Sequence, residues 1–171
     1  MRKGGTLAFF GYKDHYFVDY PAATKILDHY CYGPGKSLMG EYWEQPGRSI
    51  LRGRYKAIVP PEADWQDIKR VEYEPGTNGP SSGTLGERLM HRELTLGAIE
   101  GYARTFSAYH AWQGEHPEKK SRSEGGTGDV VDEMFDAMIE AEPDWQELGE
   151  NWREKVVEIE WGSIILLARK K

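Results

Sequence analysis

The sequence has one cysteine, fewer basic residues than acidic ones (22 against 28) and no long apolar run. Its one cysteine, Cys31, cannot form a disulfide within the chain, and no CxxC pair is present for zinc or redox chemistry. The net charge of −6 argues against nucleic acid as a partner, because a polyanion is bound through cations that neutralise its phosphates. No apolar run approaches the roughly 20 residues that cross a bilayer, and the run after Lys3 is too short for a signal peptide. We therefore expect a cytoplasmic protein that binds neither nucleic acid nor a membrane.

Several catalytic signatures are also missing. The five histidines show neither HxxxH nor HExxH spacing, so no metal site is predicted, and the GxSxG of serine hydrolases is absent. A cofactor-binding GxGxxG loop must follow a strand and open a helix. Residues 125–128, Gly-Gly-Thr-Gly, precede a predicted helix but follow no strand, and their neighbours are charged or polar. We interpret them as a solvated linker.

What the sequence does contain is an α/β pattern on a chain of 171 residues, enough for one domain with a core. Residues 6–12 and 164–168 are apolar without alternation, which is typical of strands buried on both faces of a sheet. We predict that these two segments are adjacent antiparallel strands. Apolar and acidic residues alternate over 157–161, and the Gly162-Ser163 pair that follows predicts the turn of a closing hairpin.

Four segments show the spacing of apolar residues that is typical of helices. They are residues 19–33, 48–58, 98–113 and 130–139. Pro21 suits the first turn of the first helix. Ser107 is placed to cap a second helix within the third segment and so divide it. Asp129 or Thr127 is expected to cap the last helix, and Pro143 to end it.

Two segments rich in glycine, serine and charge, residues 74–83 and 114–128, are predicted to be the most mobile. The first is flanked by the predicted strands 68–73 and 89–96. Two strands around such a loop predict a small hairpin. We expect this hairpin to stand apart from the main sheet, as part of a cap.

Four short segments resemble the class I S-adenosylmethionine-dependent methyltransferases. KGGTL at residues 3–7 is similar to the start of their fifth strand, and WGSIILLARK at 161–170 is similar to their final hairpin. GYARTFSAYHAW at 101–112 and YWEQPG at 42–47 resemble the trans-aconitate methyltransferase-like branch, especially its fungal members. The resemblance maps onto the C-terminal half of this family.

The resemblance implies the C-terminal part of a Rossmann-like α/β sheet, with strands in the order 5-7-6 and the last strand antiparallel between the other two. Residues 1–171 would form a single partial methyltransferase domain, with residues 38–128 inserted as a cap or lid of helices and a β-hairpin. The family binds its cofactor through a glycine-rich loop after the first strand and an acidic residue at the end of the second. Neither is present in this sequence.

Arg104 and its neighbours are the first candidates for binding a methyl acceptor. The Arg104 guanidinium can hold a substrate carboxylate bidentately, or form a structural salt bridge with a nearby glutamate. By the resemblance, Tyr109, His110 and Trp112 would line the acceptor site, with core packing as the alternative for Trp112. His110 is a candidate to accept a proton or to donate to a carboxylate.

Two more candidates lie outside this segment. Tyr12 ends the first predicted strand, and ligands of doubly wound sheets bind beyond the carboxyl ends of the strands. Trp43 lies in the aromatic segment that precedes the second predicted helix. Both are expected to contact the acceptor.

The function implied by the resemblance is methyl transfer from S-adenosylmethionine to a small-molecule acceptor, with a polycarboxylic acid as the candidate class. This chain would supply the acceptor-side half, and we expect that it does not bind S-adenosylmethionine alone. The alternatives are a non-catalytic truncated paralogue that acts as a binding or partner module, and a small-ligand binder without methyl chemistry. An apolar strand with an open edge also predicts a homodimer, or a partner that supplies the missing half.

Overall fold

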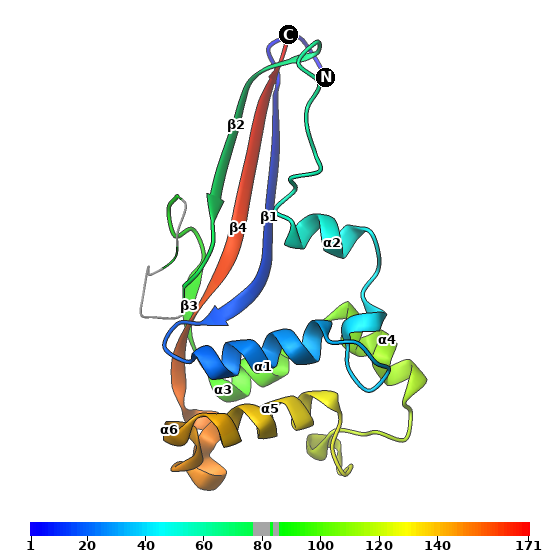
Figure 1. The fold of residues 1–171 in the computed structure, drawn as a ribbon, viewed down its shortest axis with the longest axis vertical. Coiled ribbons are helices and arrows are strands. Elements are labelled where there is room, and N and C mark those ends of the chain that lie inside the picture. Colours follow the sequence, from blue (N-terminus) through cyan, green and yellow to red (C-terminus); the bar gives the residue numbers. More distant parts are fainter. Residues whose placement is uncertain (77–82, 84–85) are drawn as a thin grey trace. The chain divides into compact units, whose positions relative to one another are not determined.

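The computed structural model describes residues 1–76, 83 and 86–171. Figure 1 shows its strands, α-helices and short 3-10 helices (η). Along the chain they are β1 (Thr6–Phe17), α1 (Pro21–Tyr32), η1 (Gly40–Tyr42), α2 (Gly47–Arg52), β2 (Trp65–Tyr73), β3 (His91–Thr95), α3 (Leu96–Ala103), α4 (Ser107–Glu115), η2 (Arg122–Glu124), α5 (Val130–Ala141), α6 (Pro143–Gln146), η3 (Gly149–Glu154) and β4 (Val156–Lys170).

The chain divides into two compact units. The sheet unit consists of Met1–Val18, Gln45–Arg92 and Ile159–Lys171, and the helical unit consists of Asp19–Glu44 and Glu93–Glu158. Each unit is built from segments that are distant in the sequence, because β1 and β4 come from opposite ends of the chain. The predicted cap of residues 38–128 does not coincide with either unit and stays a prediction.

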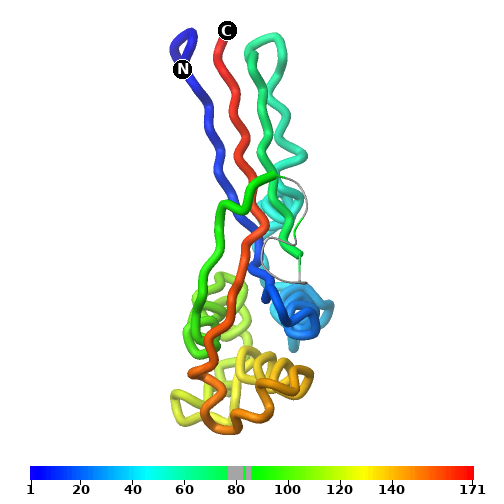
Figure 2. The backbone as a smooth tube through the Cα atoms, turned by 90° about the vertical axis from the view of Figure 1, so that its left-hand side faces the viewer, coloured from blue at the N-terminus to red at the C-terminus, as the bar shows by residue number. Residues whose placement is uncertain are grey.

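In the sheet unit, β4 lies between β1 and β2 and runs antiparallel to both (Figure 2). Leu7 lies opposite Ala168, and Gly11 lies opposite Ile164. The predicted antiparallel pairing of the two apolar runs is therefore confirmed. Their predicted burial on both faces is wrong for β1, because the Phe10 side chain is 53% exposed.

The predicted closing hairpin is also wrong, because β4 continues through Gly162 and Ser163 as one strand of 15 residues. Ser163 lies opposite Tyr12 on one side and Tyr73 on the other, so both edges of the strand are paired where the turn was expected. A Cβ at Gly162 would lie 2.7 Å from Lys13 Cε, so a larger residue there would require the Lys13 side chain to move.

β2 belongs to the main sheet rather than to a separate hairpin, which corrects a second prediction. It pairs with β4 from Trp65 opposite Lys170 to Tyr73 opposite Ser163, and β3 pairs with β4 as well. The pairing of β2 with β4 was not predicted, because the pattern of apolar residues does not show which strand lies beside β4. The loop predicted to be mobile, 74–83, falls largely on residues 77–82, which lie outside the described residues.

The second predicted helix is shorter than expected. α2 ends at Arg52, and the chain leaves the helical conformation at Arg54 and Tyr55, whose φ angles are 53° and 52°. Gly53 follows α2 directly. The positive φ angles of Arg54 and Tyr55 change the direction of the chain, and the Tyr55 side chain then lies on the sheet. There, the Tyr55 ring lies edge-on to the Phe9 ring, with 6.4 Å between centroids.

In the helical unit, α1 packs against α5. Pro21 occupies the first turn of α1, as predicted. Asp129 caps α5 through the N–H groups of Val131 and Asp132, and the Asp132 carboxylate accepts from the Asp129 N–H in return. This capping box fixes where α5 begins and follows the prediction for Asp129.

The third predicted helix is divided in two near Ser107, as predicted. α3 ends at Ala103 and α4 begins at Ser107, but the capping position belongs to Phe106, and no side chain caps α4. Thr95 caps α3 by accepting a hydrogen bond from the Ala98 N–H at 3.2 Å.

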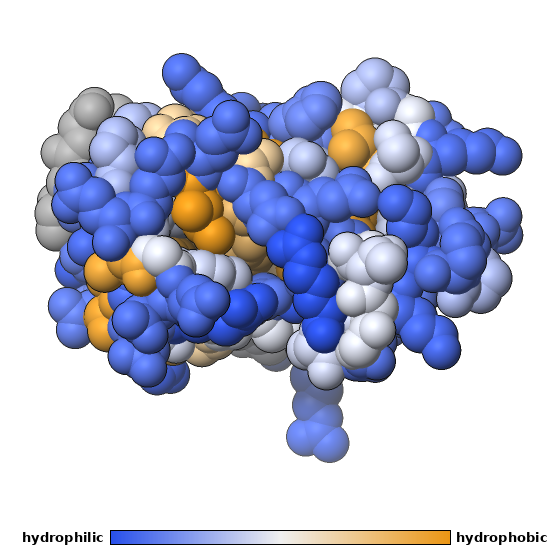
Figure 3. Space-filling model, turned by 90° about the horizontal axis from the view of Figure 1, so that it is seen from below, coloured by the Kyte–Doolittle hydropathy of each residue, from blue (hydrophilic) through white to orange (hydrophobic). Residues whose placement is uncertain are grey.

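The face in Figure 3 is mostly hydrophilic, with small hydrophobic areas between polar side chains. Among the described residues, no helix is both long and apolar enough to span a membrane.

Candidate functional site

Arg104 lies at the C-terminal end of α3 and faces the N-terminus of α5. Its Nε and Nη2 donate to the two oxygens of Asp129, at 3.2 and 3.1 Å. Nη1 donates to Glu100 Oε1 at 2.9 Å, and Nη2 donates to Asp132 Oδ1 at 2.9 Å. Four of the five N–H donors of a guanidinium are thereby paired with protein carboxylates. The geometry is that of the structural salt bridge considered above, and contact with a substrate stays a prediction.

The carboxylate of Asp129 is the centre of this cluster. Burial raises the pKa of Asp129, but the Asp132 N–H, the Arg104 guanidinium and the Tyr109 hydroxyl together hold it below its usual value. The Tyr109 hydroxyl donates to Asp129 Oδ2 at 2.8 Å. Burial and this bond to a carboxylate raise the pKa of Tyr109, so its proton is retained at neutral pH.

Glu100 extends the cluster to η3. Its side chain is 7% exposed, and Arg153 Nε donates to Oε2 at 2.8 Å. Arg104 and Arg153 therefore share one buried carboxylate, which ties α3 to η3 as well as to α5. We name Arg104, Asp129, Asp132, Glu100 and Arg153 the ion cluster. Charges buried in this way are strongly destabilising when one partner is removed.

Trp43 lies in an aromatic cluster beside α4. Its ring stacks on Tyr32 at 5.8 Å between centroids and is tilted against Phe106 at 5.7 Å. The indole Nε1 donates to the Cys31 carbonyl at 2.7 Å. With 8% of its surface exposed, Trp43 offers little area to a ligand in this conformation.

The three predicted residues of α4 differ in exposure. Tyr109 and Trp112 are 4% and 2% exposed, whereas His110 is exposed. The Trp112 ring stacks on His116 at 4.4 Å between centroids, which is the core packing considered as its alternative. The His110 ring lies edge-on to Tyr109 at 5.6 Å. Of these three, His110 is the side chain that a ligand can reach.

Tyr12 belongs to the sheet unit, whereas the other five predicted residues belong to the helical unit. It is 42% exposed, and its ring lies 6.3 Å from that of Phe10. The structure thus brings Arg104 and Tyr109 together on Asp129 and places Trp43 beside the start of α4.

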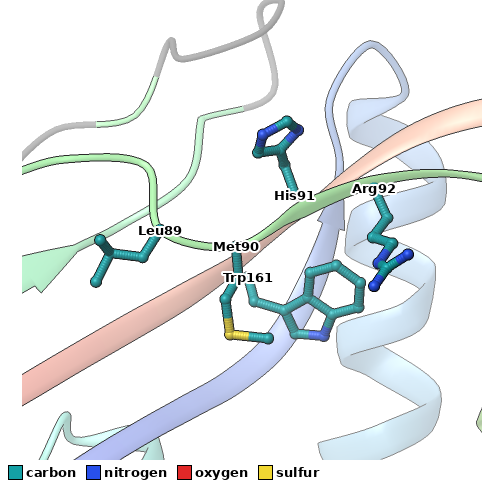
Figure 4. Close-up of a pocket in the computed structure, with 5 residues that line it drawn as sticks. All are labelled: Leu89, Met90, His91, Arg92 and Trp161. Atoms are coloured by element: carbon teal, nitrogen blue, oxygen red, sulfur yellow. The ribbon is translucent and has the colours of Figure 1, made fainter.

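A pocket of about 280 Å³ in the sheet unit was missed by sequence reasoning. Its lining residues are Leu89, Met90, His91, Arg92 and Trp161. The backbone N–H of Trp161 donates to the Met90 carbonyl at 3.1 Å. Figure 4 shows the indole between the side chains of Met90 and Arg92, with His91 on the opposite side of the strand. The sequence does not reveal this pocket, because its lining residues come together only when β3 is aligned with β4.

A buried carboxylate in the sheet unit was missed as well. Glu160 is fully buried, and it accepts from the Tyr73 hydroxyl at 2.5 Å and from Arg88 Nη1 at 2.7 Å. Burial and the Glu160 carboxylate raise the pKa of Tyr73 to about 12. The alternation of apolar and acidic residues over 157–161 is typical of a strand with one face in solvent, but Glu160 is buried.

The described residues do not fit S-adenosylmethionine as the family binds it. The family's cofactor loop connects a strand to the helix that follows it, and the connections from β1 to α1 and from β3 to α3 are of this kind. The connection from β1 to α1, residues 18–20, contains no glycine. The glycine after β3 is Gly97, and it packs closely against Arg153 within the helical unit, since a Cβ there would lie 3.2 Å from Arg153 Cβ.

The glycine segment 125–128 fits no better. It follows η2 rather than a strand, in agreement with the linker interpretation. The Gly126 N–H donates to Ser121 O at 2.9 Å and the Gly128 N–H donates to Lys120 O at 3.1 Å. A Cβ at Gly126 would lie 2.2 Å from Lys120 O, so the chain itself occupies the space. These N–H groups close a local turn instead of facing a ligand.

No protein-family model matches the chain. Over 123 residues, or 70% of its length, it is 30% identical to a Saccharomyces cerevisiae protein described as a probable S-adenosylmethionine-dependent methyltransferase, CRG1. A structure described as a type II methyltransferase from Anaeromyxobacter dehalogenans matches 98% of the chain with a TM-score of 0.58 at 19% identity. The chain spans 42% of the yeast protein and 53% of the bacterial one. Together, the sequence and fold similarities support an α/β methyltransferase fold for this chain.

Proposed function

We propose that this chain contributes the acceptor-side part of an S-adenosylmethionine-dependent methyltransferase that acts on a small-molecule acceptor. The observation that carries the proposal is the similarity to the yeast methyltransferase over 70% of the chain. The fold similarity to the bacterial methyltransferase supports it independently of sequence identity. The trans-aconitate methyltransferase-like segments of the sequence favour a polycarboxylic acid as the acceptor class.

The side chains of the helical unit suit a reaction that needs no general base. A carboxylate acceptor is already ionised at neutral pH, so positioning and exclusion of water are the main contributions of the protein. Tyr109 keeps its proton, and Arg104 is paired with carboxylates, so neither is available as a base. Among the candidate residues of the helical unit, the exposed side chain of His110 is the one that we propose contacts the acceptor.

A non-catalytic partner module is the second candidate. It is favoured by the lack of a fitting cofactor loop among the described residues. In that case the chain would retain the fold of a methyltransferase and bind a complete enzyme without taking part in methyl transfer.

A chimera tests the proposal. The segment of the yeast relative that matches this chain is replaced by the chain itself, and the protein is assayed with methyl-labelled S-adenosylmethionine against mono-, di- and tricarboxylic acids. We expect label in a methyl ester, which base hydrolyses to methanol, with a preference for acids that carry more than one carboxylate. A folded chimera that binds S-adenosylmethionine but methylates no carboxylic acid would contradict the acceptor class.

Two histidine variants sharpen the test. His110 and His29 are both exposed, and each lies edge-on to the tyrosine beside it, at 5.6 and 5.7 Å between ring centroids. His110→Ala is expected to raise the KM for the acceptor, and His29→Ala is expected to leave it unchanged. Equal effects would remove His110 from the acceptor site. A chimera that folds and binds S-adenosylmethionine but transfers no label to any acceptor would favour the partner module.

A further inference from the structure

The pocket beside β3 has an apolar wall that is fixed by its neighbours. The Trp161 indole is 7% exposed and is tilted against the His15 ring, with 6.1 Å between ring centroids. The backbone N–H of Trp161 donates to the Met90 carbonyl, so these two residues lie opposite each other on neighbouring segments. Side chains of opposite residues share a face of a sheet. Met90 therefore continues the wall that the indole begins.

Arg92 adds a cation to this wall. It lies two residues after Met90, and Figure 4 shows the side chains of both on the same side of the strand, with the Trp161 indole between them. Arg92 is exposed and forms no ion pair with a residue that the structure describes. Arg88 differs, because its Nη1 pairs with Glu160 Oε1 at 2.7 Å. The guanidinium of Arg92 is therefore available to a ligand.

The charge of the surrounding unit favours an anionic ligand. The sheet unit carries 14 of the 22 basic residues and 8 of the 28 acidic ones, which leaves 8 basic and 20 acidic residues to the helical unit. The net charge of −6 thus combines a basic sheet unit with a strongly acidic helical unit. An excess of one sign of charge attracts small ions of the opposite sign toward that surface. Arg92 belongs to the basic unit.

The size and lining of the pocket limit the ligand further. The volume of about 280 Å³ lies just below the roughly 300–1,000 Å³ of pockets for drug-sized ligands, so a smaller molecule fits. Leu89, Met90 and Trp161 supply apolar surface, and aromatic rings pack in offset or edge-on contact with an indole. The guanidinium of Arg92 has the geometry to hold a carboxylate through two parallel hydrogen bonds. Together these groups fit a small aromatic carboxylate.

We propose that the pocket lined by Leu89, Met90, His91, Arg92 and Trp161 is a binding site for a small aromatic carboxylate. The carboxylate pairs with Arg92, and the ring packs between Met90 and the Trp161 indole. The inference goes beyond the proposed function, because it requires no methyl transfer and because the acceptor contact proposed above, His110, belongs to the helical unit.

Three probes separate the contribution of the charge from that of the ring. The full chain is titrated by calorimetry with 3-phenylpropionate, with 3-phenylpropanamide, which lacks the charge, and with propionate, which lacks the ring. We expect 3-phenylpropionate to bind with a dissociation constant at or below about 1 mM, which is reasonable for a ligand of this size. The amide and propionate are each expected to bind at least about tenfold more weakly.

Arg92→Gln and Arg169→Gln form a matched pair of variants. Both arginines are exposed, belong to the sheet unit and form no ion pair with a described residue, so each change removes the same charge from the same unit. Arg92→Gln is expected to weaken 3-phenylpropionate binding at least about tenfold, and Arg169→Gln by less than about twofold. Circular dichroism checks that both variants fold.

The indole N–H signal of Trp161 locates the ligand. In two-dimensional NMR spectra this signal, assigned through Trp161→Phe, is expected to shift on addition of 3-phenylpropionate to the native chain. Equal weakening by Arg92→Gln and Arg169→Gln would show that only the general charge of the unit attracts the anion, and would overturn the site. Equal affinity for the amide, an unmoved Trp161 signal or no binding of 3-phenylpropionate at about 10 mM would also overturn it.

Discussion

Asp129 accepts two hydrogen bonds from Arg104, at 3.2 Å from Nε and 3.1 Å from Nη2. The same carboxylate caps α5 through the N–H groups of Val131 and Asp132. One side chain therefore fixes the start of α5 and anchors the end of α3. The Tyr109 hydroxyl reaches it from α4, so three helices of the helical unit meet at one buried charge.

Removing this charge is expected to destabilise the helical unit strongly. Asp129→Asn keeps a capping oxygen but leaves Arg104 without its main partner, and we expect the free energy of unfolding to fall by about 3 kcal/mol. Urea unfolding followed by tryptophan fluorescence measures it. Asp136→Asn is the control, because Asp136 pairs with Arg122 at a surface where its side chain is 52% exposed. If both variants lose equal stability, the ion cluster does not hold the helices together.

His15 predicts a dependence of stability on pH. It is 1% exposed and lies against the rings of Phe17 and Trp161. Burial lowers the pKa of His15 from 6.5 to about 4, against the opposite influence of Asp14. Below pH 6.5 the unfolded chain therefore takes up a proton that the folded chain refuses until about pH 4. The contribution of neutral, buried His15 to the free energy of unfolding is complete above pH 6.5 and is lost as the pH falls from 6.5 to about 4.

Between about pH 7.5 and pH 5, we expect the free energy of unfolding to fall by about 2 kcal/mol from this residue. Urea unfolding at the two pH values measures the fall, and His15→Leu is expected to lose less stability than the native sequence over the same interval. An equal loss in both proteins would show that His15 is not buried in its neutral form.

Gly11 and Tyr55 predict a strong coupling in the sheet unit. A Cβ at Gly11 would lie 2.4 Å from the Tyr55 hydroxyl, so Gly11→Ala must displace the ring and is expected to destabilise by about 1–3 kcal/mol. Tyr55→Ala removes the obstacle, so the double variant should recover part of the Gly11→Ala loss in a mutant cycle. Gly114→Ala, in helix α4 with nothing within 4 Å, should be neutral or stabilising. Strict additivity of the two sheet variants would contradict the contact.

Part of this fold follows directly from local sequence. The pairing of β1 with β4 was predicted because two apolar runs without alternation need a common sheet. α5 was predicted because its apolar residues form one helical face and Asp129 stands before it, and the same local reasoning gave Pro21 at the start of α1. The starts of α1 and α5 depend on neighbours within a few residues, whereas the pairing of β1 with β4 was inferred from the shared apolar character of two distant segments.

The rest depends on contacts that are distant in sequence. β2 reads as a strand, but nothing local says that Val71 pairs with Ile165. The Gly162-Ser163 pair resembles a turn until β1 and β2 are both placed beside it. Arg104 was proposed for a substrate because Asp129, 25 residues away, could not be recognised as its partner from the sequence. Strand register was therefore the main source of error, and long-range ion pairs such as that of Arg104 with Asp129 were not visible in the sequence.

The most direct test of the acceptor-side assignment is a calorimetric titration of S-adenosylmethionine into this chain alone. The described residues provide no loop that fits the cofactor, since the Gly126 and Gly128 N–H groups close a local turn and the β1–α1 connection lacks glycine. We predict no binding with a dissociation constant at or below about 10 μM. A dissociation constant at or below that value would contradict the account and would show that this chain carries a cofactor site of its own.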